Sequence, residues 1–150
     1  MKILFTCSSG GHLEELLQLR KLIDKNESYL LTENNQIHDD LFIKIFKVNQ
    51  INRKEKFFIF HFFKLFFKSA KIYKKIKPEV IISTGALVTV PVCFIGKLCH
   101  CKIVYIESFA RIYKPSLTGK IMYKFADVFI VQWPELLSFF PKAKYFGGIF

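Results

Sequence analysis

The sequence lacks a long uninterrupted hydrophobic run. The apolar stretch after Lys2 is only Ile-Leu-Phe before a polar loop, which is too short for a cleavable signal peptide. Elsewhere, lysines interrupt the apolar runs well short of the roughly 20 residues that a membrane-spanning helix needs. We therefore expect a cytoplasmic protein.

Cysteine is also scarce. The four cysteines, Cys7, Cys93, Cys99 and Cys101, show no disulfide framework and are predicted to be reduced thiols. Cys99-His100-Cys101 could be metal ligands, but adjacent residues on a short loop point apart and no second Cys/His pair accompanies them. We expect no metal site.

Acidic residues are few relative to basic ones. The chain has 23 Lys and Arg against 12 Asp and Glu, for a formal net charge of +11. Nearly all of this excess lies between Lys44 and Lys77, where Glu55 is the only acid. Such a patch indicates an anionic partner, which could be nucleic acid, an anionic membrane or a phosphorylated ligand.

Linkers, internal repeats and low-complexity tracts are absent, so the 150 residues are predicted to form one domain, 1–150. Apolar, β-rich runs alternate with helical patterns, and most runs are continuous, as is typical of parallel strands buried on both faces. This alternation predicts the α/β class, with a Rossmann-like, doubly wound parallel sheet. Strands are predicted within 2–7, 28–32, 44–49, 79–84, 102–107, 127–132 and 143–147, and helices within 12–25, 37–43, 55–77, 88–99, 116–125 and 134–140.

Ligands of such sheets bind beyond the carboxyl ends of the strands. This rule selects the loops 8–12, 84–88 and 107–111, which should line one edge of the sheet. In the first loop, a diphosphate could be cradled by Ser8, Ser9, Gly10 and Gly11, with His12 as a base or phosphate ligand. The alternative is a tight turn with an N-cap serine, since SSGGH matches neither GxGxxG nor a P-loop.

The other two loops repeat this chemistry. Thr84 and Gly85 follow an apolar strand, and Glu107 ends another, with Ser108 and Arg111 close behind it. A base, an acid and a phosphate-binding cation form a plausible constellation, although Glu107 could equally be a solvated loop acid.

The segment 56–77 combines lysine and phenylalanine on different faces of a predicted helix. Its apolar arc is wider than one core contact needs, so part of the aromatic surface should project outward, as in an interfacial membrane helix. A core crossover helix with solvated lysines is one alternative; nucleic-acid binding is less favoured, because it needs aromatics interleaved with charge. The predicted membrane-binding residues are Phe57, Phe60, Phe63, Lys64, Phe67, Lys68, Lys71 and Lys75.

The segment 105–136 contains the motifs ESFAR, SLTGK, AD and VQWPEL, and it is followed by FFPKAKYFGG. These motifs resemble the membrane-recruiting subunit of the eukaryotic two-subunit UDP-N-acetylglucosamine transferase and its bacterial counterparts, the PssD and CpsF type proteins of exopolysaccharide and capsule synthesis. SSGGHLEELL is similar to the GSGGHTxEML of that family, so the resemblance covers essentially the whole chain.

The resemblance implies the N-terminal, lipid-acceptor half of a split GT-B glycosyltransferase similar to MurG, whose loop reads GGTGGH; here Ser8 and Ser9 stand in place of its Gly and Thr. It also implies that a partner chain binds the UDP-sugar, forming a heterodimer. The expected reaction transfers a sugar to a polyprenyl-diphosphate-linked sugar at the inner face of the cell membrane, in capsular, exopolysaccharide or lipid-linked oligosaccharide synthesis. His12 or Glu107 would be the base, the loops 8–12 and 84–88 would hold the diphosphate, and no metal, cofactor or nucleic acid is required.

The C-terminal segment is expected to meet that partner. The predicted interface residues are Trp133, Glu135, Phe146, Ile149 and Phe150, although Trp133 could instead be core. A different class of function stays open, in which the chain is a noncatalytic membrane adaptor that recruits and activates the catalytic subunit. Such an adaptor would need the aromatic helix and this interface, but it would not need polar side chains at the ends of the strands.

Overall fold

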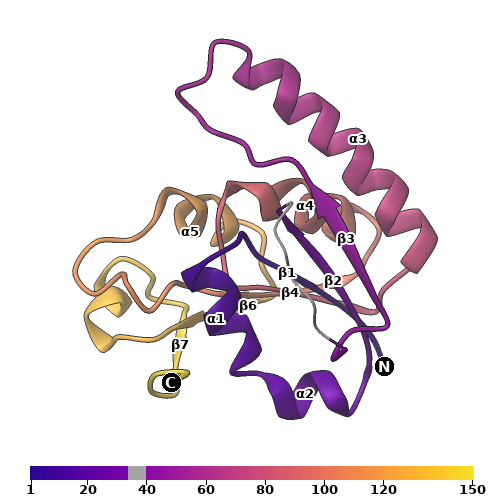
Figure 1. Ribbon diagram of the computed structural model, residues 1–150. Coiled ribbons are helices and arrows are strands. Elements are labelled where there is room, and N and C mark those ends of the chain that lie inside the picture. The colour runs from indigo at the N-terminus through magenta and orange to yellow at the C-terminus, as the bar shows by residue number, and fades with distance from the viewer. Residues whose placement is uncertain (34–39) are drawn as a thin grey trace.

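The computed structural model, which describes residues 1–33 and 40–150, contains a seven-stranded parallel sheet with the order β3-β2-β1-β4-β5-β6-β7 (Figure 1). This confirms the predicted fold class. The strands are β1 (Lys2–Thr6), β2 (Glu27–Glu33), β3 (Lys44–Val48), β4 (Val80–Ser83), β5 (Lys102–Ile106), β6 (Val128–Val131) and β7 (Lys144–Tyr145).

Helices cover both faces of the sheet (Figure 1). One face packs against α1 (Gly11–Leu17) and α2 (Arg20–Asp24), and the other against α3 (Phe58–Ile76), α4 (Val90–Leu98) and α5 (Leu117–Met122). Alternate side chains of β1 enter the two cores, with Ile3 and Phe5 on the α1 side and Leu4 on the α3 side. Burial on both faces is the physical reason for the continuous apolar runs.

Several predicted helices differ from the observed ones. The expected helix 12–25 is divided into α1 and α2 by a turn at Gln18 and Leu19. Of the expected helix 37–43, residues 37–39 lie outside the described residues, and 40–43 form turns and bends. The expected helix 88–99 begins with a short 3₁₀ turn, η1 (Leu87–Thr89), which leads into α4. The expected helix 134–140 is a 3₁₀ helix, η2 (Pro134–Ser138), rather than an α-helix.

The strand order reverses between β1 and β4, which are paired in the middle of the sheet. In a doubly wound sheet this reversal opens a crevice at the carboxyl ends of the two strands. The loops that follow β1 and β4 therefore lie side by side, and the loop after β5 is their next neighbour.

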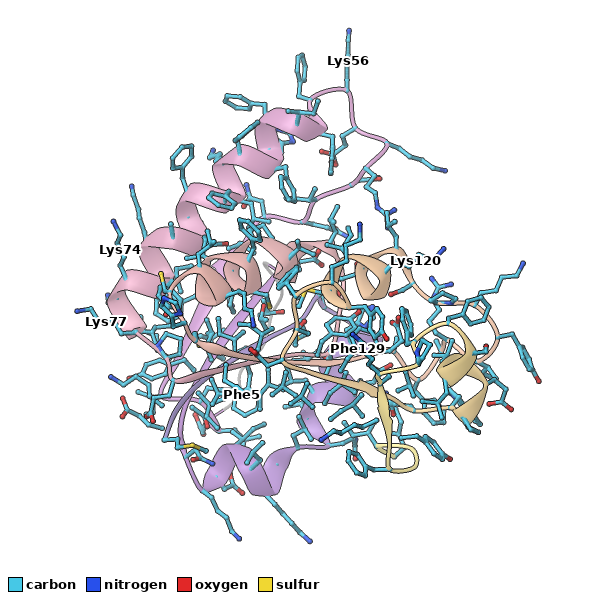
Figure 2. All side chains as sticks on the ribbon, turned by 180° about the vertical axis from the view of Figure 1, so that it is seen from behind. Phe5, Lys56, Lys74, Lys77, Lys120 and Phe129 are labelled. Carbon is cyan, nitrogen blue, oxygen red and sulfur yellow. The ribbon has the colours of Figure 1, made fainter. Side chains whose placement is uncertain are left out.

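Helix α3 has one buried and one exposed side. Its core residues are Leu65, Ser69, Ile72, Tyr73 and Ile76. Its beginning projects away from the sheet (Figure 1), with Lys56 at the free end and Lys74 and Lys77 at the end beside the sheet (Figure 2). Within the described part of the chain, none of the helices is both long and apolar enough to cross a membrane.

A buried carboxylate joins α1 to the loop after β5. Glu15 is only 4% exposed, and its Oε1 accepts hydrogen bonds from Ser108 Oγ at 2.9 Å and from Phe109 N at 3.0 Å. Its Oε2 has no partner within the described structure. Burial raises the pKa of Glu15 above its ordinary 4.5; the two hydrogen bonds and the nearby His12 oppose this shift, and Glu107 adds to it.

The two sides of α3 should respond differently to truncation. Leu65→Ala removes a side chain that is 5% exposed, and it should lower the free energy of unfolding by about 2–4 kcal/mol. Phe63→Ala removes one that is 59% exposed, and it should change that free energy by less than about 0.5 kcal/mol. Urea unfolding followed by circular dichroism measures both, and equal losses would contradict the assignment of the two faces.

Glu15 should make stability depend on pH. The pKa of Glu15 in the folded protein is raised above 4.5, so the fold favours the neutral acid. The stabilisation that comes from this preference is fully present below pH 4.5, and it is lost as the pH rises through the folded pKa. Glu15→Gln keeps an acceptor oxygen for Ser108 and Phe109, and its stability relative to the wild type should therefore improve from pH 4 towards pH 7.

Glu15→Ala is the matched comparison. It leaves the Ser108 hydroxyl and the Phe109 N–H without their acceptor, and it should be about 1–3 kcal/mol less stable than Glu15→Gln at every pH. Urea unfolding of the three proteins across this range measures the difference. If Gln and Ala at position 15 were equally destabilising, the hydrogen bonds would not be what Glu15 contributes.

Candidate functional site

A cleft of about 790 Å³ lies at the carboxyl edge of the sheet. Its walls include Ser8, Ser9 and His12 after β1, residues 86–88 after β4, and residues of the loop after β5. This confirms the expectation that the three loops line one edge. Two further walls come from the loop 50–55, which leads into α3, and from residues 116–118 at the start of α5.

His12 is fixed across the crevice by two hydrogen bonds to Thr84. The ring Nδ1 lies 2.9 Å from the carbonyl oxygen of Thr84, and Thr84 Oγ1 donates to the carbonyl oxygen of His12 at 2.7 Å. A carbonyl oxygen can only accept, so Nδ1 carries the proton, and Nε2 of the neutral ring is left as an acceptor. His12 therefore lines the cleft in the tautomer that a general base requires.

Thr84 and Gly85 support His12 rather than lining the cleft. Both are buried, and the wall from this loop is formed by residues 86–88 instead. Gly85 has a φ of +119°, and a Cβ there would lie 3.0 Å from His12 Cε1. Glycine thus leaves room for the imidazole. Direct contact of Thr84 and Gly85 with a diphosphate stays a prediction without geometric support.

The serine and glycine loop has two different halves. Ser9 lines the cleft, and its hydroxyl donates to Glu33 Oε2 at 3.1 Å, while the largely buried Ser8 donates to the carbonyl of Ser9 at 3.3 Å. The N-cap of α1 is Gly10, with a φ of +76°, and not a serine. Gly10 and Gly11 are exposed, and a Cβ on either would meet no atom within 4 Å.

Glu107 is fully buried and is not part of the cleft wall. Its Oε1 accepts from Ser116 Oγ at 2.8 Å and from Ser108 N at 3.0 Å, and its Oε2 accepts from Ser116 N at 3.2 Å. Ser116 in turn caps α5, and a Cβ on Gly119 would overlap the Glu107 carboxylate. These contacts join the motifs ESFAR and SLTGK into one structural unit, so the geometry favours His12 over Glu107 as a base.

Cations face the cleft from two loops. Arg111 is exposed and lines the cleft, and its guanidinium group makes no hydrogen bond or ion pair within the described structure. Arg53 and Lys54 line the opposite wall. Sequence reasoning counted these two only as part of the basic patch. It also missed Glu33, although the strand-end rule applied to β2 would have selected that residue.

The side chains predicted to bind a membrane are exposed on α3 and just before it. Their exposed fractions are 65% for Phe57, 68% for Phe60, 59% for Phe63 and 66% for Phe67. Ile59, which the sequence analysis did not select, joins them at 71%, and we call these five residues the apolar ridge. The predicted Lys64, Lys68, Lys71 and Lys75 are exposed as well. Membrane binding itself stays a prediction.

The predicted partner-interface residues lie around Phe109. Trp133 donates through Nε1 to the Phe109 carbonyl at 2.7 Å, and the rings of Trp133 and Phe150 lie 4.9 and 5.2 Å from that of Phe109. The Ile149 N–H donates to Gln132 Oε1 at 2.9 Å. The C-terminal segment thus folds back on its own chain, and it leaves Phe146 and Phe150 exposed at 75% and 64%; Glu135 is exposed as well.

The cysteines are free thiols. Burial raises the pKa of Cys7 to about 12 and that of Cys101 to about 11, so both stay protonated. Within residues 1–33 and 40–150, no group of three or more His, Cys, Asp or Glu residues is arranged to hold a metal ion.

Solved structures with the same architecture include MurG and UDP-N-acetylglucosamine 2-epimerases. The structure superposes on MurG of Acinetobacter baumannii with a TM-score of 0.78 and 18% identity, over 99% of this chain and 46% of that one. It superposes on UDP-N-acetylglucosamine 2-epimerase of Rickettsia bellii with the same TM-score and 14% identity, over 99% of this chain and 45% of that one. At these identities the similarity establishes the fold alone. The chain spans less than half of either enzyme.

Sequence relatives carry one shared description, UDP-N-acetylglucosamine transferase subunit. The Kluyveromyces lactis protein is 34% identical over 93% of this chain and 74% of its own length, and the human one is 28% identical over 99% and 83%. The Schizosaccharomyces pombe protein is 44% identical over 47% of this chain, a match that spans only 36% of that relative. Residues 28–149 match the family described as "Oligosaccharide biosynthesis protein Alg14 like". The chain therefore belongs to the Alg14-like family of oligosaccharide biosynthesis proteins.

Proposed function

We propose that this protein is the acceptor-binding subunit of a two-component glycosyltransferase. It would transfer a sugar from a UDP-sugar, with UDP-N-acetylglucosamine as the first candidate, to a polyprenyl-diphosphate-linked sugar. The relatives named as transferase subunits support the reaction class. The observation that carries the proposal is the His12 imidazole, held by Thr84 in the tautomer of a base inside the cleft.

The proposed chemistry is a single displacement. Nε2 of His12 takes the proton of the acceptor hydroxyl while its oxygen bonds to the anomeric carbon of the donor sugar. The bond between that carbon and the diphosphate breaks, and the electron pair leaves with UDP. The cations Arg111, Arg53 and Lys54 would attract the negatively charged phosphate groups of the substrates towards the cleft. The donor would be held mainly by the partner subunit, with no metal or cofactor in this chain.

Glu107 has a positioning role in this scheme. It holds Ser116, and through it the start of α5, which forms one wall of the cleft. The loop 107–111, anchored by both Glu15 and Glu107, then presents Arg111 to the cleft.

The apolar ridge supports attachment to the inner face of the cell membrane. Exposed side chains of this size, next to lysines of the same helix, suit a surface with an apolar interior and anionic headgroups. Peripheral attachment there would bring the cleft to the lipid-linked acceptor. Capsule or exopolysaccharide synthesis in a bacterium, or lipid-linked oligosaccharide synthesis in general, is the proposed setting.

The partner surface is proposed to include Trp133, Glu135, Phe146, Ile149 and Phe150. Phe146 and Phe150 leave apolar area exposed at the end of the chain, which a donor-binding subunit would cover in a heterodimer.

A noncatalytic adaptor is the second candidate. One observation favours it: the apolar ridge and the exposed rings of Phe146 and Phe150 lie outside the cleft. Binding through these surfaces does not require a reaction in the cleft. Under this alternative the partner transfers sugar alone, and this chain only raises the rate by bringing it to the membrane.

Substitution of His12 separates the two candidates. In the reconstituted pair, His12→Ala should lower kcat/KM for transfer of radiolabelled sugar by about 10²–10⁴-fold, because it removes the base. The pair should still assemble in size-exclusion chromatography. His100→Asn, at an exposed residue whose φ of 60° asparagine accepts, is the control and should transfer at the wild-type rate.

The same assay is run with this chain alone, the partner alone and both together. Activity that requires both chains and His12 supports a shared catalytic site. Full turnover by the His12→Ala pair would end the catalytic proposal and leave the adaptor.

Membrane attachment should depend on the ridge. Phe63→Ser/Phe67→Ser should weaken binding to anionic phospholipid vesicles by about tenfold or more, because both side chains would otherwise be buried in the lipid interface. Tyr113→Ser/Phe139→Ser removes rings that are 73% and 51% exposed outside α3, and it should leave vesicle binding unchanged. Equal losses in a vesicle sedimentation assay would contradict a specific role of the ridge.

A further inference from the structure

A second hollow, of about 360 Å³, lies between α3 and the segment 48–55. Leu65, Val48 and Ile51 supply apolar lining, while His61, Lys64 and Lys68 contribute cationic or titratable groups from α3. Lys64 and Lys68 are predicted to bind a membrane, but neither the sequence analysis nor the names of the relatives assign a function to the hollow itself. Its mixed lining is suited to a ligand with one anionic and one apolar part.

The charges of the hollow are only partly compensated. Glu55 is its only acid, and its Oε2 lies 3.1 Å from His61 Nδ1. Lys68 donates to the main-chain carbonyl of Lys47 at 2.7 Å, which orients the ammonium but does not neutralise it. The ammonium group of Lys64 makes no hydrogen bond or ion pair within the described structure. Two lysine charges therefore remain available to an anion.

The hollow lies between the apolar ridge and the cleft. On the helix, Lys64 is one turn from both Phe60 and Phe67, so this lysine of the hollow borders the apolar ridge directly. On its other side, the hollow shares Gln50, Ile51 and Glu55 with the wall of the cleft. A single extended ligand can thus contact the ridge, the hollow and the cleft in this order.

We infer that the hollow binds the diphosphate of a lipid whose chain lies along the apolar ridge and whose polar end reaches the cleft. This inference rests on the proposed function, and it places the acceptor's diphosphate in the hollow rather than at the loops 8–12 and 84–88. The diphosphate is recognised by Lys64 and Lys68, beside His61, and the sugar beyond it extends towards His12. The two lysines then act in substrate recognition, whereas Lys71 and Lys75, which do not line the hollow, act only through general attraction to an anionic surface.

Two double variants with the same change in net charge test this assignment. Lys64→Gln/Lys68→Gln alters the hollow, and Lys71→Gln/Lys75→Gln alters the same helix outside it. Binding is measured to phosphatidylcholine vesicles that contain either phosphatidylglycerol or undecaprenyl diphosphate at equal negative charge. Inorganic pyrophosphate serves as a soluble competitor, and circular dichroism melting checks folding. Lys64→Gln alone is the milder variant, because it leaves the Lys68 contact with Lys47 intact.

The wild type should prefer undecaprenyl diphosphate vesicles by about tenfold, since each charge-assisted hydrogen bond adds to the surface attraction. Lys64→Gln/Lys68→Gln should lose this preference, whereas Lys71→Gln/Lys75→Gln should keep it. The two double variants should bind phosphatidylglycerol vesicles with the same reduced affinity. Pyrophosphate should compete with the undecaprenyl diphosphate vesicles only at a concentration much higher than that of the lipid. The inference is overturned by an absent preference, by equal losses in both variants, or by pyrophosphate that binds as tightly as the lipid.

Sugar transfer separates this failure from failure of the proposed function. If the hollow binds the diphosphate, Lys64→Gln/Lys68→Gln should raise KM for the lipid acceptor about tenfold with little change in kcat. An unchanged KM would overturn the inference while leaving the transferase intact. A wild-type pair without any transfer would instead refute the proposed function, and the vesicle preference would still decide whether the hollow binds lipid diphosphate.

Discussion

The parallel pairing of the strands is the constraint on which the rest of the structure depends. It brings the carboxyl ends of β1, β4 and β5 to one edge, so that residues more than 70 positions apart in the sequence meet there. The two hydrogen bonds between His12 and Thr84 are the direct result, because they join the loops on either side of the point where the strand order reverses. Without this juxtaposition the imidazole would have no fixed tautomer.

Two buried acidic side chains, Glu15 and Glu107, stabilise the loops at the same edge of the sheet. Glu15 binds the loop after β5 from α1, and Glu107 binds the start of α5 from the end of β5. Both oxygens of Glu107 accept hydrogen bonds, whereas only one oxygen of Glu15 does, so the burial of a charge is better compensated at Glu107. The cleft can therefore keep its shape although loops form most of its wall.

The fold was predictable from the sequence because most strands are continuous apolar runs, as is typical of parallel strands buried on both faces. Helix α3 was predictable as well, since its 19 residues repeat an amphipathic period many times. The break at Gln18 was not, because no proline or glycine marks it. Its cause lies in local turn geometry rather than in composition.

The site was predictable in position but only partly in the roles of its residues. His12 and Glu107 both follow strands at the same edge of the sheet, and the sequence analysis left either of them as the base. What separates them is the donors that reach Glu107 from Ser116, nine positions further along, and no local pattern reports that contact. The wall formed by the loop 50–55 was missed for a similar reason: its place depends on how far the start of α3 projects from the sheet.

The loop 50–55 connects the apolar ridge to the cleft within one short stretch of chain. Under the proposed function, with the ridge in a bilayer, the cleft would lie within one loop of the lipid surface. A lipid-linked acceptor would then reach it by lateral diffusion in two dimensions, while a soluble donor would arrive from the bulk. The turnover of such an enzyme follows the surface density of its lipid substrate rather than its molar concentration. Dilution of the membrane with inert lipid then acts as an inhibitor, even when the total amounts of protein and substrate are unchanged.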